Sequence, residues 1–295
     1  MVHVKIPATT ANMGAGFDSF GMAFDLFNEI TVEKSDSFSI ISSSNVPKTK
    51  DNLIYKSILH FYSQVGRAVP HLRITQTDRI PFTRGLGSSA ACIVGGIVAA
   101  NAIEGNLIDN SALLQMACQM DGHPDNVAPA LLGGLVVAAV EHNDVNYVKI
   151  NPPNELAFIS IVPNFVLSTK KARDVLPSGY SREDVVFNVS RASLFIASVM
   201  SEKWGNISAA LDDRIHQPYR NPLVPNMENI FSKSKEFGAL GAYLSGAGPT
   251  VMVITLKTNE QEFLANIEHY LESLSDKWCA QPMRPNFNGT VVCMK

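Results

Sequence analysis

The chain has 295 residues, of which 46% are hydrophobic and 17% charged, and its formal net charge is −3. This composition excludes a disordered chain, and the length allows about two packed units or one large one. The small net charge gives no electrostatic reason to expect binding to nucleic acid or to an anionic membrane, so any phosphate must be bound by a local site.

The cysteines and the apolar segments indicate the redox environment of the protein and whether it associates with a membrane. Its four cysteines, at positions 92, 118, 279 and 293, form no CxxC pair and no Cys/His cluster with metal-ligand spacing. They predict reduced, mostly buried thiols in a cytoplasmic protein. The N-terminus has no apolar signal-peptide core, and the longest nearly apolar stretch, 90–103, is too short to span a bilayer. We therefore expect no membrane partner.

The spacing of apolar residues predicts both strands and helices. In chain order these are strands 2–6, 29–33 and 38–42, helix 52–65, strand 72–75, helices 88–103 and 111–120, strands 134–140 and 156–162, helices 170–175, 182–203 and 228–237, strands 242–244 and 251–256, helix 260–274 and strand 290–294. The proline-containing seam at 151–154 divides them into two halves, 1–152 and 153–295. Such runs of strands and helices predict the α+β class.

The segment 81–91, with the sequence PFTRGLGSSAA, is the most informative part of the chain. Gly85 and Gly87 allow a turn and a close approach of the backbone to a ligand. Ser88 or Ser89 can cap the helix that follows, whose first amides and dipole form an anion site. The segment is neither a Walker A loop nor a Rossmann GxGxxG loop. It predicts a phosphate site, and the alternative is a plain Gly/Ser turn before a core helix.

Three segments together resemble the small-molecule kinase family named after galactokinase, homoserine kinase, mevalonate kinase and phosphomevalonate kinase. They are 7–18 (PATTANMGAGFD), 81–91 and 244–250 (LSGAGPT). Their order and their spread over most of the chain make the match specific. Within the family, four segments resemble the members that phosphorylate L-homoserine: 12–18, 121–130, 168–177 and 216–220.

The resemblance implies ATP- and Mg²⁺-dependent phosphorylation of the side-chain hydroxyl of L-homoserine to O-phospho-L-homoserine, a step towards threonine. It also implies an N-terminal nucleotide-binding half (1–152) like ribosomal protein S5, and a ferredoxin-like C-terminal half (153–295) that completes the acceptor site. A homodimer is common among such kinases, although the sequence itself does not give the oligomeric state. The nucleotide-binding residues carried over are Asn52, Pro81, Phe82, Thr83, Arg84, Gly85, Leu86, Gly87, Ser88, Ser89, Ala90 and Ala91.

L-Homoserine carries an ammonium, a carboxylate and a hydroxyl, so its site needs an anion, a cation and a group that orients the hydroxyl. We assign the ammonium to Asp18, with Asn12 beside it as a hydrogen-bonding partner. Arg173 and Arg220 are candidates for the carboxylate, which a guanidinium can bind through two parallel bonds. Thr169, four residues before Arg173 and on the same helix face, can contact the hydroxyl. The alternatives are a turn cap for Asp18 and surface ion pairs for the arginines.

The remaining assignments concern the metal ion, His123 and the loop expected to cover the site. We expect Ser89 and Asp121 to hold Mg²⁺, which prefers oxygen ligands beside the phosphates; the family often has a glutamate where Asp121 stands. His123 is expected in the substrate pocket rather than as a base, with a structural histidine as the alternative. Gly246 and Gly248 belong to a loop that we expect to close over phosphates and acceptor, although it also suits a tight turn between two strands.

The expected catalytic residues are Asn126, Thr169 and Arg173. Some family members use an aspartate seven residues before a Gly-Gly pair as general base, and that position here is Asn126. Loss of a base costs roughly 10²–10⁴ in rate, but positioning alone can supply roughly 7–11 kcal/mol. We therefore expect catalysis without a carboxylate general base: Asn126 orients the hydroxyl, whose proton passes to a phosphate oxygen or through water. Asp125, an expected substrate-binding residue, is the rival base.

Two other functions stay open at the level of the sequence. A kinase of the same family acting on another alcohol, such as mevalonate, would not need Asp18, because mevalonate has no ammonium. A nucleotide-binding regulatory protein that has lost catalysis would bind ATP without producing ADP in response to an acceptor.

Overall fold

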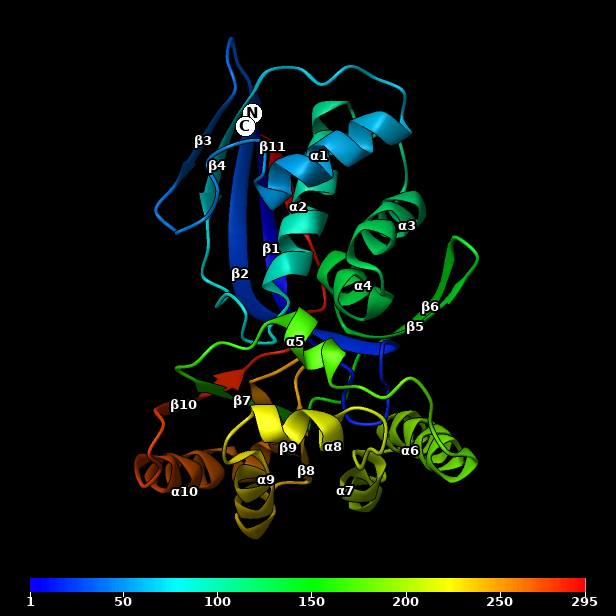
Figure 1. Cartoon of the computed structure of the whole chain (residues 1–295), viewed down its shortest axis with the longest axis vertical. Helices are drawn as coiled ribbons and strands as arrows, with labels where there is room; N and C mark the ends of the chain where they lie inside the picture. Colours follow the sequence, from blue (N-terminus) through cyan, green and yellow to red (C-terminus); the bar gives the residue numbers. More distant parts are fainter. Residues whose placement is uncertain (295) are drawn as a thin grey trace.

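The computed structural model describes residues 1–294 and shows two halves, each built on its own β-sheet (Figure 1). One half, at the top of Figure 1, carries a seven-stranded sheet, and the other carries a four-stranded sheet. The predicted α+β class in two halves is confirmed.

The seven-stranded sheet has the order β11-β1-β2-β4-β3, with β5 pairing β2 and β6. Its strands are β1 (Val2–Ala11), β2 (Phe20–Lys34), β3 (Ser39–Ser42), β4 (Leu72–Thr77), β5 (Leu135–Glu141), β6 (Asp144–Ile150) and β11 (Val291–Met294). The sequence missed β6 and predicted β1 and β2 much too short. Beyond residue 6, β1 continues as Pro7–Ala11 and is buried on both faces, so it lacks the alternation that marks a half-buried strand.

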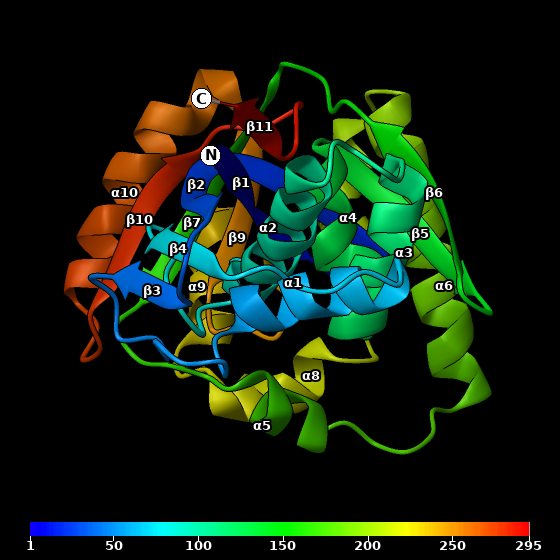
Figure 2. The same ribbon diagram turned by 90° about the horizontal axis from the view of Figure 1, so that it is seen from above.

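Four helices lie on one face of this sheet (Figure 2). They are α1 (Leu53–Gln64), α2 (Ser88–Ile103), α3 (Asn110–Asp121) and α4 (Pro124–Leu132). The central helix, α2, is buried nearly all round and packs against the other three helices and against β1. Since α2 begins within the 81–91 segment, the burial of the helix fixes where that segment lies.

The four-stranded sheet is antiparallel with the order β10-β7-β9-β8. Its strands are β7 (Leu156–Pro163), β8 (Gly241–Leu244), β9 (Val251–Leu256) and β10 (Trp278–Met283). Helical segments join β7 to β8 and β9 to β10, which is the ferredoxin-like arrangement. The helices are α5 (Thr169–Asp174), α6 (Arg182–Met200), α7 (Ile207–Ala210), α8 (Gln217–Arg220), α9 (Met227–Glu236) and α10 (Glu260–Glu272), with 3-10 turns at Trp204–Asn206, Asn221–Leu223 and Lys257–Asn259.

The second sheet joins the two halves because both of its faces are buried. Phe158, Met252 and Ile254 belong to the core shared with the first half. The alternate residues Ile159 and Val253 belong to a second core, formed with α9 and α10. Successive side chains of a strand point to opposite faces, so one sheet serves both cores.

The last strand does not follow the predicted division of the chain. Residues 291–294 were assigned to the C-terminal half, but β11 pairs with β1 of the first sheet, with Val4 opposite Val292. The first and last strands, β1 and β11, therefore lie side by side (Figures 1 and 2). The pairing covers an edge of β1 that would otherwise expose unpaired backbone groups.

The thiols differ in part from the prediction. All four are free, but only Cys92 and Cys118 are buried, whereas Cys279 and Cys293 are exposed. The last two lie on the outer strands β10 and β11, where alternate side chains face solvent. Over residues 1–294, no helix combines the length and apolar character needed to cross a bilayer.

Candidate active site

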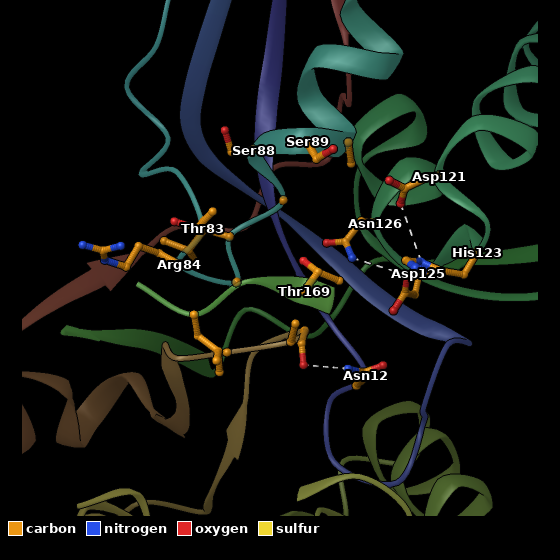
Figure 3. A pocket seen from close by; sticks show the side chains of 18 of the residues that line it. Asn12, Thr83, Arg84, Ser88, Ser89, Asp121, His123, Asp125, Asn126 and Thr169 are labelled. Carbon is orange, nitrogen blue, oxygen red and sulfur yellow. Dashed lines mark hydrogen bonds and ion pairs between the residues drawn. The ribbon is translucent and has the colours of Figure 1, made fainter. Parts of the chain in front are cut away.

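A cavity of about 260 Å³ lies between the two halves (Figure 3). Almost every residue that the sequence singled out lines it: Asn12, Asp18, Pro81, Thr83, Arg84, Gly85, Leu86, Gly87, Ser88, Ser89, Ala90, Asp121, His123, Asp125, Asn126, Thr169, Arg173, Arg220, Gly246 and Gly248. Only Asn52, Phe82 and Ala91 lie outside its wall. Leu167 and Ala247 also line the cavity. Ala247 lies in the predicted 244–250 loop, whereas the sequence missed Leu167 because a single apolar residue carries no signal of a site.

One wall of the cavity is the N-terminus of α2. Gly87 precedes the helix in the left-handed conformation (φ +71°), and no side chain caps the helix. The expectation that Ser88 or Ser89 caps it is therefore wrong, because a glycine occupies the capping position. Within the described residues, the amides of Ser88, Ser89 and Ala90 have no acceptor, and the carbonyl of Leu86 is taken by the amide of Thr9. These free amides and the helix dipole suit a phosphate.

Arg84 lies in the loop but turns its guanidinium away from the free amides (Figure 3). Its Nε donates to the carbonyl of Pro163 at 3.0 Å, and its Nη2 donates to the carbonyl of Asn164 at 2.8 Å. Arg84 therefore ties the loop to the end of β7, in the other half. Burial lowers the pKa of Arg84, but the arrangement makes this residue an anchor of the loop, and direct phosphate binding by it stays a prediction.

A second pocket of about 230 Å³ adjoins the first and shares Thr83, Ser88 and Ser89 with it. Its wall is mostly apolar, and it contains the predicted Asn52 and Phe82 together with the unpredicted Val46, Pro47, Leu53, Gln76 and Cys92. The Asn52 amide caps α1 by accepting from the Ile54 amide, and it donates to Gln76 and to the Pro47 carbonyl. Asn52 thus shapes a pocket of a size and polarity that suit a nucleobase.

The opposite wall carries an ion pair. Arg173, at the end of α5, donates from Nη2 to Asp18 Oδ1 at 2.9 Å and from Nη1 to Oδ2 at 3.4 Å. Asn12 accepts from the Asp18 amide and donates to the Gly246 carbonyl, so it holds the 12–18 loop against the 244–250 loop. Asn12 is therefore Asp18's hydrogen-bonding partner, as the sequence predicted, and the Asp18–Arg173 pair stands within the cavity rather than on the outer surface.

Three further acidic or imidazole groups, Asp121, His123 and Asp125, gather in one part of the cavity (Figure 3). His123 Nδ1 lies 2.8 Å from Asp125 Oδ1 and 3.6 Å from Asp121 Oδ2. Ligand atoms of Asp18, His123 and Asp125 all lie within 4.8 Å of one another. Burial lowers the pKa of His123, but the hydrogen bond to Asp125 and the charges of the three aspartates outweigh it and raise the pKa above its usual value. The cluster attracts a cation.

Arg220 is almost fully buried beneath the cavity, on α8. Its Nε donates to the Ala172 carbonyl at 3.0 Å, and its Nη1 donates to the Gly246 carbonyl at 3.0 Å and faces His216 Nδ1 at 3.2 Å. Within residues 1–294, no partner of Nη2 is found. Burial, followed by the nearby Arg173, lowers the pKa of Arg220 to about 10, so the guanidinium stays charged at neutral pH.

The predicted pair for Mg²⁺, Ser89 and Asp121, lies at the upper end of the cavity in Figure 3. The Asp121 carboxylate is largely buried and has no hydrogen bond from any described residue; His123 is its only ion-pair partner. Burial raises the pKa of Asp121 to about 6, with His123 opposing and Asp125 adding to the rise. A buried, underpaired carboxylate beside a serine hydroxyl and free amides fits a hard cation bridging phosphates.

Replacing Asp121 by asparagine is expected to stabilise the metal-free protein while weakening its response to Mg²⁺. Asp121 binds a proton more tightly in the folded chain than in the unfolded one, so its ionisation lowers stability as pH rises from about 4 to about 6, by about 1–3 kcal/mol in all. Thermal melts at pH 7.5 should show a higher midpoint for Asp121→Asn and less stabilisation by added Mg²⁺. The change Asp144→Asn, at an exposed carboxylate, is the control; an unchanged Mg²⁺ response in Asp121→Asn would remove this residue from the metal site.

Comparisons with known proteins agree with this geometry. The descriptions "GHMP kinases N terminal domain" and "GHMP kinases C terminal" match residues 52–134 and 195–272. Curated homoserine kinases of Clostridium kluyveri and Caldicellulosiruptor saccharolyticus are 41% and 43% identical, covering 99% of this chain and 98% and 96% of theirs. A crystal structure of homoserine kinase from Cytophaga hutchinsonii superimposes with a TM-score of 0.90 at 28% identity, covering 99% of this chain and 97% of that one. The chain therefore belongs to the homoserine kinases, within the GHMP kinase family.

Proposed function

We propose that the chain transfers the γ-phosphoryl group of ATP to the side-chain hydroxyl of L-homoserine, forming O-phospho-L-homoserine on the way to threonine in the cytoplasm. The observation that carries this proposal is a single cavity with two unlike walls. An uncapped helix N-terminus of the first half forms one wall, and the Asp18–Arg173 pair, which joins the two halves, forms the opposite one. The first wall matches a polyphosphate, and the second matches a zwitterionic amino acid.

The acceptor would bind by inserting itself into the ion pair. Its ammonium would lie beside Asp18 and Asp125, and its carboxylate beside Arg173 and the free Nη2 of Arg220. Asp18 would then pair with the ammonium instead of Arg173, and Arg173 would pair with the carboxylate instead of Asp18. Thr169 lies in the first turn of α5 and lines the cavity. Its hydroxyl makes no hydrogen bond with any described side chain, so it can contact the acceptor.

The nucleotide would place its base in the apolar pocket beside Asn52 and its phosphates on the amides that begin α2. Ser89 and Asp121 would hold Mg²⁺, which neutralises charge on the phosphates. Gly246 and Gly248 complete the cavity from the 244–250 loop, whose Ser245 hydroxyl donates to the Gly85 carbonyl at 2.5 Å. The loop at 81–91 is thus held from both halves, which favours a fixed position for the phosphates.

Asp125, the rival base, is already engaged by its neighbours. Asp125 Oδ1 already faces His123 at 2.8 Å and accepts from Asn126 Nδ2 at 3.3 Å. Both contacts engage Oδ1 before an acceptor binds. Asn126 orients the acceptor hydroxyl in our proposal, and the proton leaves late, to a phosphate oxygen or to water. A homodimer, common among such kinases, stays a prediction.

L-Homoserine is expected to drive ADP release from ATP, and mevalonate is not. In Asp18→Asn the loss of a charged hydrogen bond to the ammonium should raise KM for L-homoserine about 10–100-fold, with KM for ATP unchanged. A coupled ADP assay and phosphorus NMR of the product check this, with Asp36→Asn at an exposed carboxylate as control. Rapid turnover of mevalonate without turnover of L-homoserine would contradict the substrate assignment. Tight ATP binding without acceptor-dependent ADP would favour the regulatory alternative.

A further inference from the structure

Thr9 contacts two separate parts of the candidate active site, although it belongs to a buried strand. It lies on β1 and is fully buried. Its hydroxyl donates to Asn126 Oδ1 at 2.7 Å, and its backbone amide donates to the Leu86 carbonyl at 3.2 Å. Asn126 is the residue assigned to orient the acceptor, and Leu86 belongs to the phosphate loop. Thr9 therefore links the residue that orients the acceptor to the loop that is assigned to the phosphates.

The hydrogen bonds around Asn126 fix which end of its amide faces the acceptor. The Asp125 carboxylate can only accept, so the Asn126 atom 3.3 Å from it must be the Nδ2 group (Figure 3). Oδ1 then faces Thr9, whose hydroxyl donates to it. The Nδ2 group has two hydrogens, and Asp125 takes one of them. The other is left for the oxygen of an acceptor hydroxyl.

The same threonine sits against the phosphate loop at its tightest point. A Cβ added at Gly87 would lie 1.9 Å from Thr9 Oγ1 and 3.1 Å from Thr9 Cβ. The absence of a side chain at Gly87 thus lets the loop rest directly on the threonine. A shift of Thr9 would move the loop and the Asn126 amide together.

We infer that Thr9 is a positioning residue for phosphoryl transfer, an inference that rests on the function proposed above. Its hydroxyl holds the Asn126 amide so that Nδ2 donates to the acceptor oxygen. That bond occupies one lone pair, leaves another for attack on phosphorus, and turns the hydroxyl proton away from Asn126, towards the phosphate oxygens or water. The chain needs such a device because Asn126 itself cannot take the proton.

The test compares Thr9→Val with Thr9→Ser. Valine keeps the β-branched shape but removes the hydroxyl, so the Asn126 amide can rotate. We expect kcat to fall about 10- to 30-fold in Thr9→Val, with KM for ATP and for L-homoserine within about 2-fold of wild type. Thr9→Ser should keep kcat within about 3-fold, because its hydroxyl can make the same bond. The double variant Thr9→Val/Asn126→Ala should be no slower than Asn126→Ala alone.

Thr255→Val is the matched control, since Thr255 is fully buried in β9 and its Oγ1 has no partner among the described residues. Its kcat should equal that of wild type. The inference is overturned if Thr9→Val keeps wild-type kcat, if valine and serine lower kcat equally, or if the double variant shows additive losses. Should Thr9→Val melt below the assay temperature, Thr9→Ser against Thr9→Ala gives the same comparison. Failure of wild type to phosphorylate L-homoserine would overturn the proposed function instead.

Discussion

Replacing Gly87 by alanine is expected to lower kcat/KM by about 10²–10³-fold while the chain still folds. Gly87 has a φ of +71°, and the new methyl carbon would lie 1.9 Å from Thr9 Oγ1. Since Thr9 is held in the central strand β1, the loop must move instead. The amides that begin α2 would then leave the position at which they meet the phosphates.

The control for Gly87→Ala separates the backbone conformation from the close contact. Gly66 also has a positive φ, +66°, but an added Cβ there meets nothing within 4 Å. Gly66→Ala therefore carries a similar conformational cost of about 1–2 kcal/mol without the clash. Thermal melts should show a loss of stability in both variants, larger in Gly87→Ala because of the clash, whereas only Gly87→Ala should lose activity. Equal activity in the two variants would mean that the loop does not depend on its contact with Thr9.

Local sequence signals predicted the parts of the fold that depend on local spacing. Helix α2 was predicted with its observed bounds, 88–103, because a long apolar run after a Gly/Ser turn has few alternatives. Helix α4 was missed because it contains Pro129, which normally interrupts a helix. Pro129 has no amide hydrogen for the Asp125 carbonyl, and that carbonyl packs against Gly21 of β2, at 1.6 Å from where a Cβ would be. Only the tertiary contact reveals why the helix tolerates the proline.

The candidate site shows the same division between local and tertiary information. Residue types and motifs predicted which side chains gather, and nearly all of them line one cavity. They did not predict the partners. Arg84 looked like a phosphate ligand but donates to carbonyls at the end of β7. Asp18 pairs with Arg173 across 155 positions, and Thr9 with Asn126 across 117, distances at which sequence spacing carries no information.

Asn126→Ala is expected to lower kcat about 10²-fold without changing KM for ATP, because the acceptor hydroxyl loses the group that orients it. Asp125→Asn should instead keep kcat within about 10-fold and raise KM for L-homoserine, since Asp125 faces the ammonium in our assignment. Stopped-flow single turnovers at saturating ATP check both variants, with thermal melts to exclude unfolding. The two residues are adjacent in α4, so each variant is a close control for the other.

The opposite pattern would make Asp125 the general base. Abolished turnover in Asp125→Asn, with Asn126→Ala left intact, would contradict the assignment made here. The geometry favours a larger loss of kcat in Asn126→Ala than in Asp125→Asn. Asp125 Oδ1 already faces His123 at 2.8 Å and accepts from Asn126 at 3.3 Å. Asn126, in contrast, is held by hydrogen bonds at both ends of its amide. An amide held in this way can supply direction but cannot take a proton. Catalysis then depends on how exactingly the loop at 81–91, resting on Thr9, aligns ATP with the hydroxyl that Asn126 presents.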